Sequence, residues 1–146
     1  MSLELTGTIE FYKSWKVNKG ANANLAADTF KMLLCKDTYV PDLEAHVVPD
    51  DVVTHEVDTS GYARQTLQNT QWGLLGTAAV FSFDPVVFQA PNGDIPCKYW
   101  VVFDDTVSKL VCCGLLNNNG QSVTIEDGKD MTIAFVGGLL QEVELE

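Results

Sequence analysis

Basic residues, histidines and long apolar runs are all scarce in this chain. It carries nine Lys and Arg residues and two His residues against 20 Asp and Glu residues, a formal net charge of −11 over 146 positions. That charge argues against nucleic-acid binding, because most of the surface would repel phosphates. No run approaches the roughly 18 apolar residues of a membrane helix. The N-terminus lacks a basic region followed by an apolar core, so we expect no membrane contact, no secretory signal and a cytoplasmic site of synthesis.

The motifs that mark common cofactor and catalytic sites are also missing. There is no G-x-G-x-x-G, no Walker loop and no G-x-S-x-G elbow. None of the four cysteines is spaced as C-x-x-C, and the adjacent Cys112 and Cys113 would face opposite sides of an apolar strand. Reduced, buried thiols are therefore expected, and no cofactor, metal or catalytic residue is assigned.

Three residue groups could still carry chemistry, and each has a simpler reading. His46 and His55 lie near carboxylates, but nothing indicates that three or four ligands converge on a metal. Asp104-Asp105 and Glu126-Asp127 could act as paired carboxylates, although acidic residues at strand ends usually form turns. The aromatic residues could form a sugar platform, but in alternating strands they more often pack in a core; they are Trp72, Phe88, Tyr99, Trp100 and Phe103.

The rest of the chain reads as a succession of short strands. Asn92-Gly93, Asn119-Gly120 and Asp127-Gly128 are strong signals for hairpin turns between them. The expected strands are Thr29–Cys35, Val52–Val57, Tyr62–Leu67, Trp72–Leu75, Ala78–Phe83, Cys97–Phe103, Lys109–Leu116, Ser122–Ile125 and Met131–Val136.

One helix and one long connection interrupt this pattern. Gly7 to about Val17 is the helix candidate, with Phe11 and Trp15 as an i,i+4 pair, although residues 9–12 could equally extend a first strand. Residues 18–24 are expected to form a loop. Residues 36–51 form a long connection whose two prolines keep it out of a central strand, and it is either functional or an ordered surface crossing.

These elements predict a mainly β fold, a β-sandwich, jelly-roll-like or small-barrel domain with one short N-terminal helix. We expect a single domain over residues 1–146, divided into a helix or arm segment (1–27), a β core (28–140) and an acidic tail (141–146). Charge is uneven along it. Residues 1–36 hold five lysines against three carboxylates (net +2), and the remainder carries net −13. The basic segment could face an acidic partner or merely offset the acidic body.

Several segments match, in order, a family of small virion proteins of tailed bacteriophages. They are Phe11–Trp15, Asp28–Leu34, Asp37–Asp42, Asp51–Val57, Thr59–Tyr62, Ala78–Asp84 and Tyr99–Asp104. The chain resembles that family, whose members are described as head decoration, cement or structural proteins. The similarity covers about residues 8–136 and is specific only over 28–62. The family commonly has a glycine pair where this chain has Gln65-Thr66.

The resemblance implies a non-enzymatic component of the virion, present on the capsid surface in many copies. Its partners would be the major capsid protein and other copies of itself, as a homodimer or homotrimer. The contact residues we predict are the basic, aromatic segment and the start of the long connection: Phe11, Tyr12, Lys13, Trp15, Lys16, Tyr39 and Pro41. For the aromatic residues the alternative is core packing.

Two other functions remain open at this point. A tail, baseplate or fibre protein, including a receptor-binding module, would have the same composition. A small glycan hydrolase would need two carboxylates at a defined separation in a cleft.

Overall fold

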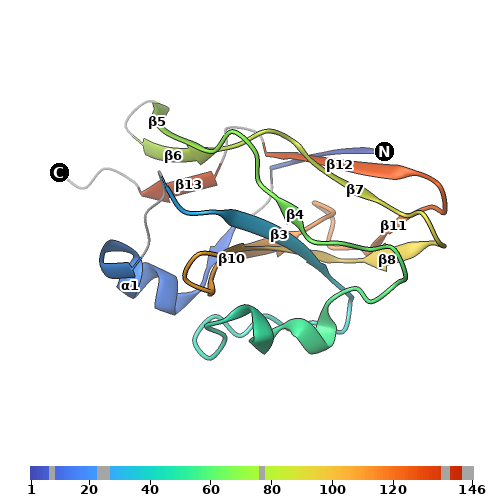
Figure 1. The fold of residues 1–146 in the computed structure, drawn as a ribbon, viewed down its shortest axis with the longest axis horizontal. Coiled ribbons are helices and arrows are strands. Elements are labelled where there is room, and N and C mark those ends of the chain that lie inside the picture. The colour runs from blue at the N-terminus through green and yellow to red at the C-terminus, as the bar shows by residue number, and fades with distance from the viewer. Residues whose placement is uncertain (7–8, 23–26, 76–77, 136–138, 143–146) are drawn as a thin grey trace.

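The computed structural model describes residues 1–6, 9–22, 27–75, 78–135 and 139–142. The fold is mainly β, as predicted, and the described strands do not close into a barrel. Two layers run along its length, with β3, β4 and β10 on one side and β1, β7 and β12 on the other (Figure 1). The one α-helix among the described residues, α1 (Lys13–Asn22), lies at one end of the layers.

The central element is an antiparallel five-stranded sheet of order β2-β10-β9-β3-β4. The facing sheet has the order β1-β12-β7, with β1 parallel to β12, and two smaller sheets pair β11 with β8 and join β13, β6 and β5. The strands are β1 (Ser2–Leu5), β2 (Glu10–Phe11), β3 (Phe30–Cys35), β4 (Gln65–Thr66), β5 (Gln71–Leu75), β6 (Ala78–Ser82), β7 (Val86–Gln89), β8 (Ile95–Cys97), β9 (Tyr99–Asp104), β10 (Lys109–Leu115), β11 (Val123–Ile125), β12 (Asp130–Phe135) and β13 (Leu139–Glu142).

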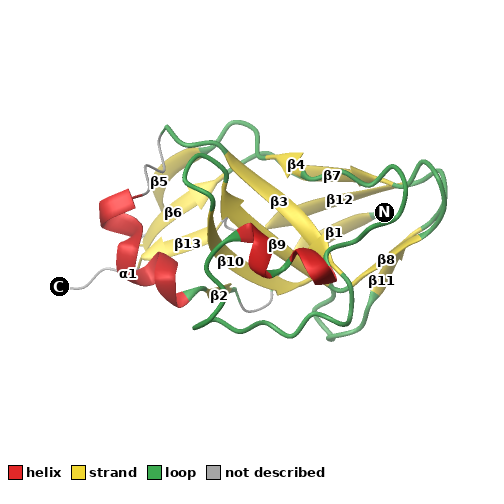
Figure 2. Ribbon diagram, turned by 60° about the horizontal axis from the view of Figure 1, so that its bottom comes forward, coloured by secondary structure: helices red, strands yellow, loops and turns green. Residues whose placement is uncertain are grey.

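Both faces of the five-stranded sheet are buried, because alternate residues of its strands enter two separate cores. On β9, Trp100 and Val102 point into the main core between the layers, whereas Val101 and Phe103 point into a second core. Residues 36–58 cover that second face, and two short 3-10 helices of this stretch lie over β9 and β10 (Figure 2). They are η1 (Pro49–Asp51) and η2 (Val53–His55). The long connection is thus the ordered surface crossing that was one of its two expected roles.

Most predicted strands are confirmed within a residue or two, but three expectations were wrong. Val52–Val57 is not a strand, because Val53–His55 forms η2 and only Glu56 makes an isolated bridge, to Cys35. The preceding helix η1 begins at Pro49, and the Asp51 carboxylate accepts hydrogen bonds from two preceding amides. Tyr62–Leu67 pairs only at β4. The predicted strand Cys97–Phe103 is divided at Lys98 into β8 and β9, which belong to different sheets.

The helix was also placed too early in the chain. Glu10 and Phe11 pair with Cys113 and Cys112 as β2, which agrees with the alternative that this segment extends a strand. The helix therefore begins at Lys13 and continues to Asn22, through part of the predicted loop, and Phe11 and Trp15 form no i,i+4 helical pair. Three strands were not predicted, namely β1, β7 and β13.

The three glycine turns lie where they were predicted, with positive φ at Gly93, Gly120 and Gly128. None of them joins two strands that pair with each other, so they are not hairpin turns. Instead, β7 continues into β8 and β11 into β12 as two bent strands that pair along both halves. Reciprocal bonds tie their corners together, since Gly93 donates to Asp127 and Asp127 donates to Asp94.

All four cysteines are free and buried, and Cys112 and Cys113 enter the two different cores as expected. Burial raises the pKa of the Cys35 and Cys97 thiols to about 12 and that of Cys113 to about 11. The thiols are consequently neutral and unreactive near pH 8.

We expect the native protein to react slowly with a thiol-specific disulfide reagent at pH 8, and to release four equivalents of product in guanidinium chloride. Absorbance of the released thiolate measures both. Rapid labelling of even one thiol in the native state would contradict the burial described above.

Gly114 lies where β10 crosses the ring of Trp100 in the main core. A Cβ atom there would come within 2.7 Å of the ring. Gly114→Ala should therefore destabilise the domain by about 1–3 kcal/mol through overpacking, measured by urea unfolding. Val40→Ala, at a residue that is 77% exposed, is the control and should shift stability by less than about 0.5 kcal/mol. Equal effects would contradict the tight contact.

Candidate functional site

The seven predicted contact residues fall into two groups. Tyr12, Trp15 and Tyr39 are at most 3% exposed and lie in the cores of the domain. Core packing, the alternative for the aromatic residues, is the role that this structure gives them. They support a surface from beneath and are not themselves available to a partner.

The other four residues reach solvent. Lys13 and Lys16 on α1 are exposed, and Phe11 and Pro41 are half-buried. The start of the helix contacts the long connection, because the Lys13 amide donates to the Leu43 carbonyl at 2.7 Å and its ammonium lies 3.8 Å from Glu44. The two predicted contact segments, far apart in sequence, thus lie side by side.

A chain of hydrogen bonds beneath this surface holds the two segments together. The hydroxyls of Tyr12 and Tyr39 are 2.7 Å apart, and the Tyr39 hydroxyl is 3.1 Å from His46 Nδ1. Burial raises the pKa of both tyrosines well above the usual range, so both stay neutral. The Tyr39 ring also packs between the rings of His46 and Tyr99, at 5.6 and 5.5 Å.

A surface hollow opens beside these hydrogen-bonded side chains, at the edge of β10. It has a volume of about 410 Å³ and is lined by Glu10, Pro41, Tyr99, Cys113, Gly114, Leu115 and Asn118. Within the described part of the chain, β2 pairs only with Cys112 and Cys113, so no strand covers the outer edge of β10 beyond them. Leu115 is 38% exposed in the hollow, and Val40, next to Pro41, is 77% exposed. Such an arrangement suits contact with a protein better than turnover of a small molecule.

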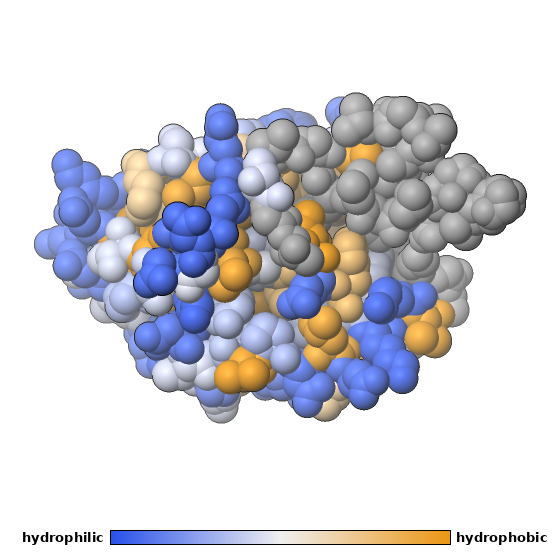
Figure 3. All heavy atoms as spheres, turned by 180° about the vertical axis from the view of Figure 1, so that it is seen from behind, coloured by the Kyte–Doolittle hydropathy of each residue, from blue (hydrophilic) through white to orange (hydrophobic). Residues whose placement is uncertain are grey.

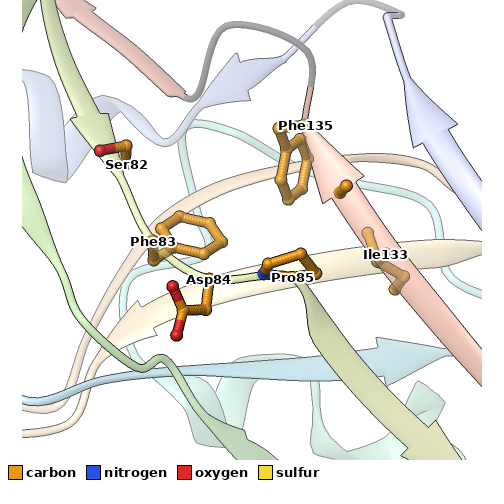
Figure 4. Close-up of a pocket in the computed structure, with 7 residues that line it drawn as sticks. Ser82, Phe83, Asp84, Pro85, Ile133 and Phe135 are labelled. Atoms are coloured by element: carbon orange, nitrogen blue, oxygen red, sulfur yellow. The ribbon is translucent and has the colours of Figure 1, made fainter.

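A smaller hollow of about 160 Å³ lies between the end of β6 and β12. The rings of Phe83 and Phe135 meet edge to face at 5.7 Å, with Pro85 and Ile133 beside them (Figure 4). The Asp84 carboxylate points away from these rings and accepts a hydrogen bond from Asn69 at 2.6 Å. The two rings and their apolar neighbours therefore give this hollow no convergent set of reactive groups.

A partly buried ion pair fixes the segment 36–58 to the five-stranded sheet, with 9% of the Glu56 side chain and 32% of the Arg64 side chain exposed. Arg64 donates to both carboxylate oxygens of Glu56, at 3.0 and 2.8 Å, and its guanidinium lies 5.1 Å above the Phe103 ring. Tyr62 donates to Glu56 at 2.7 Å and accepts from the Leu34 amide of β3. The hydrogen bonds to Glu56 raise the pKa of Arg64. This cluster is structural, since every charge in it is satisfied by a neighbour.

The residues considered for chemistry are engaged elsewhere in the fold. His46 bonds to Tyr39, and His55 Nδ1 lies 3.0 Å from the Thr38 hydroxyl. Within the described ranges, no three His, Cys, Asp or Glu side chains are grouped to hold a metal. Phe88, Trp100 and Phe103 are buried, which confirms their core reading, whereas the Trp72 side chain is not among the described ones.

Asp104 is the functional candidate whose environment the sequence does not reveal. Its Oδ1 accepts from the Thr106 and Val107 amides, which confirms the predicted turn-forming role. Its side chain is fully buried, however, and faces the carboxyl group of Asp28. Its position directly after an apolar strand was the one available signal. Glu56, Tyr62, Arg64 and Leu115 had no signal of their own, because their partners are distant in sequence.

The hydrophobic residues on the rear face lie in several separate groups among polar ones (Figure 3). No described helix has the length and apolar character needed to span a bilayer. Comparison of the chain with protein-family models, curated proteins and solved structures finds no match in any of the three.

Arg64→Met should destabilise the domain by about 2–3 kcal/mol, because it leaves the buried Glu56 carboxylate without its cation. The free energy of unfolding in urea measures this. Lys36→Met is the matched control, because its side chain is about as exposed as that of Arg64 but its partner Asp58 is 83% exposed, so this pair should contribute less than about 1 kcal/mol. The structural role of the Glu56–Arg64 pair would be refuted if the two variants were equally stable.

Proposed function

We propose that this chain is a non-enzymatic structural protein of a tailed-bacteriophage virion, which decorates or cements the capsid by binding the major capsid protein. The observation that carries the proposal is the ordered resemblance of residues 28–62 to that family of virion proteins. A head, tail or fibre position is distinguished by copy number alone.

The arrangement of those residues supports a binding role. Asp28–Leu34 leads into and forms most of β3, and the segment Asp37–Tyr62 supplies most of the residues (36–58) that cover the second face of the five-stranded sheet. Both segments therefore build a scaffold, with Tyr39 and Glu56 holding it rigid from within. A rigid surface loses little conformational entropy when it binds a partner.

The exposed part of that scaffold supplies the contact surface of the proposal. It consists of Lys13 and Lys16 on α1, Val40 and Pro41 on the long connection, and Leu115 at the open edge of β10. The lysines would contact acidic groups of the capsid protein, and the aliphatic residues would be buried in the contact.

The first test is the copy number of the chain relative to the major capsid protein in purified virions, by quantitative mass spectrometry. Hundreds of copies would support capsid decoration. A few dozen or fewer would instead favour the tail or fibre reading, and complete absence from virions would refute both.

Replacing Lys13 and Lys16 together by Glu should weaken attachment to capsids at least about tenfold without changing the fold, because both side chains are exposed. Binding to capsids that lack the protein, followed by sedimentation, measures this. Lys129→Glu, on the turn before β12, is a single charge reversal away from this surface and should bind normally. Trp15 is unsuitable for this test because it is buried.

A further inference from the structure

We propose that Asp104 and Asp28 form a proton-dependent latch. One proton shared by the two carboxyl groups fastens the β9–β10 turn to the residues just before β3. The latch is closed while the pair holds the proton and opens when both carboxyl groups ionise. It is independent of the virion assignment.

The geometry leaves one oxygen of a buried acid without a donor that would stabilise its ionised form. Asp104 is fully buried at the end of β9, directly opposite Phe30 of β3 in the sheet register. One carboxylate oxygen caps the turn, but the other is buried with no donor from the described residues. That second oxygen can be satisfied as a protonated hydroxyl that donates to the carboxylate of Asp28.

The charged neighbours do not supply the missing compensation. Lys31 of β3 pairs at 3.5 Å with Asp105 of the turn, and Lys109 of β10 lies opposite Asp104 in the register. Within the described part of the chain, no Lys or Arg side chain forms an ion pair with Asp104. Burial, followed by the hydrogen bond and the charge of Asp28, raises the pKa of Asp104 to about 7.

The latch controls a defined set of backbone contacts. The Asp105 amide donates to the Thr29 carbonyl at 2.8 Å, and the Thr29 amide donates to the Thr106 hydroxyl at 2.9 Å. These two bonds tie the turn to the residues just before β3, and the amides of Thr106 and Val107 bond to Asp104 within the turn. Repulsion between two ionised carboxylates would act directly on these contacts.

The sign of the pH dependence follows from proton binding. Because the folded state holds a proton that the unfolded state releases near pH 4, stability falls as the pH rises from about 4 to 7. Asp104→Asn imitates the protonated carboxyl group, since its amide can donate to Asp28 while its oxygen still caps the turn. That variant should remain latched at every pH.

Thermal unfolding and amide hydrogen exchange between pH 5 and 9, in EDTA at constant ionic strength, test the latch. The wild type should lose at least about 3 °C of melting temperature relative to Asp104→Asn as the pH rises. Protection of the Thr29, Asp105, Thr106 and Val107 amides, corrected for intrinsic exchange, should fall in the wild type alone. Asp105→Asn is the matched control and should follow the wild-type profile.

Parallel pH profiles for the wild type and Asp104→Asn would overturn the proposal. Should Asp104→Asn fail to fold, Asp28→Asn replaces it, because it removes the same repulsion and should flatten the profile equally. The proposal would also be overturned if Ca²⁺, added without EDTA at pH 8, restored the melting temperature and amide protection of the wild type. That result would identify a cation, and not a proton, as the group shared by the two carboxylates.

Discussion

The fold depends on burying both faces of the five-stranded sheet. An antiparallel sheet commonly leaves one face to solvent, but here alternate residues of β3, β9 and β10 are apolar on both sides. The facing sheet covers one side, and the second side requires a cover that is not a sheet. Residues 36–58 provide it, with Tyr39 and Val52 packed in the second core. This requirement explains why so long a connection is ordered and why its tyrosine is inaccessible.

The cover brings together the features that could serve binding. Residues 36–58 contact the start of α1 through the hydrogen bond between the Tyr39 and Tyr12 hydroxyls and through the Leu43 carbonyl, which accepts from the amide of the first helical residue. The ion pair between Glu56 and Arg64 holds them to the sheet. The aliphatic tip of the cover at Val40 and Pro41 is exposed beside the open edge of β10. The buried polar contacts hold this surface in one position, which is the property that our proposal of a structural virion protein requires. The predicted aromatic contact residues serve that surface as its support.

The Asp28–Asp104 pair differs from the other polar clusters of the molecule. Glu56 has its cation and Tyr39 has two hydrogen-bond partners, whereas one oxygen of Asp104 has no donor among the described residues. A buried acid of this kind lowers stability at high pH and is therefore an unexpected feature of a scaffold. Its location at the junction between the turn and β3 makes proton binding a means of adjusting the rigidity of that junction.

The sequence by itself determined the fold class, the main strands and the burial of the cysteines, because alternation and turn chemistry are local properties. Phe30–Cys35 and Lys109–Leu115 are apolar enough to be strands in any context, and Gly93 and Gly128 require turns wherever they lie. Tertiary structure decided which strands pair, since the bent strands β7–β8 and β11–β12 pair with each other across distant positions. It also decided that Val53–His55 forms a 3-10 helix instead of a strand, and that Tyr12 and Tyr39 are internal. Asp104 likewise was recognisable as a turn former, but the proximity of Asp28 depends on packing between segments 76 residues apart, which no local pattern encodes.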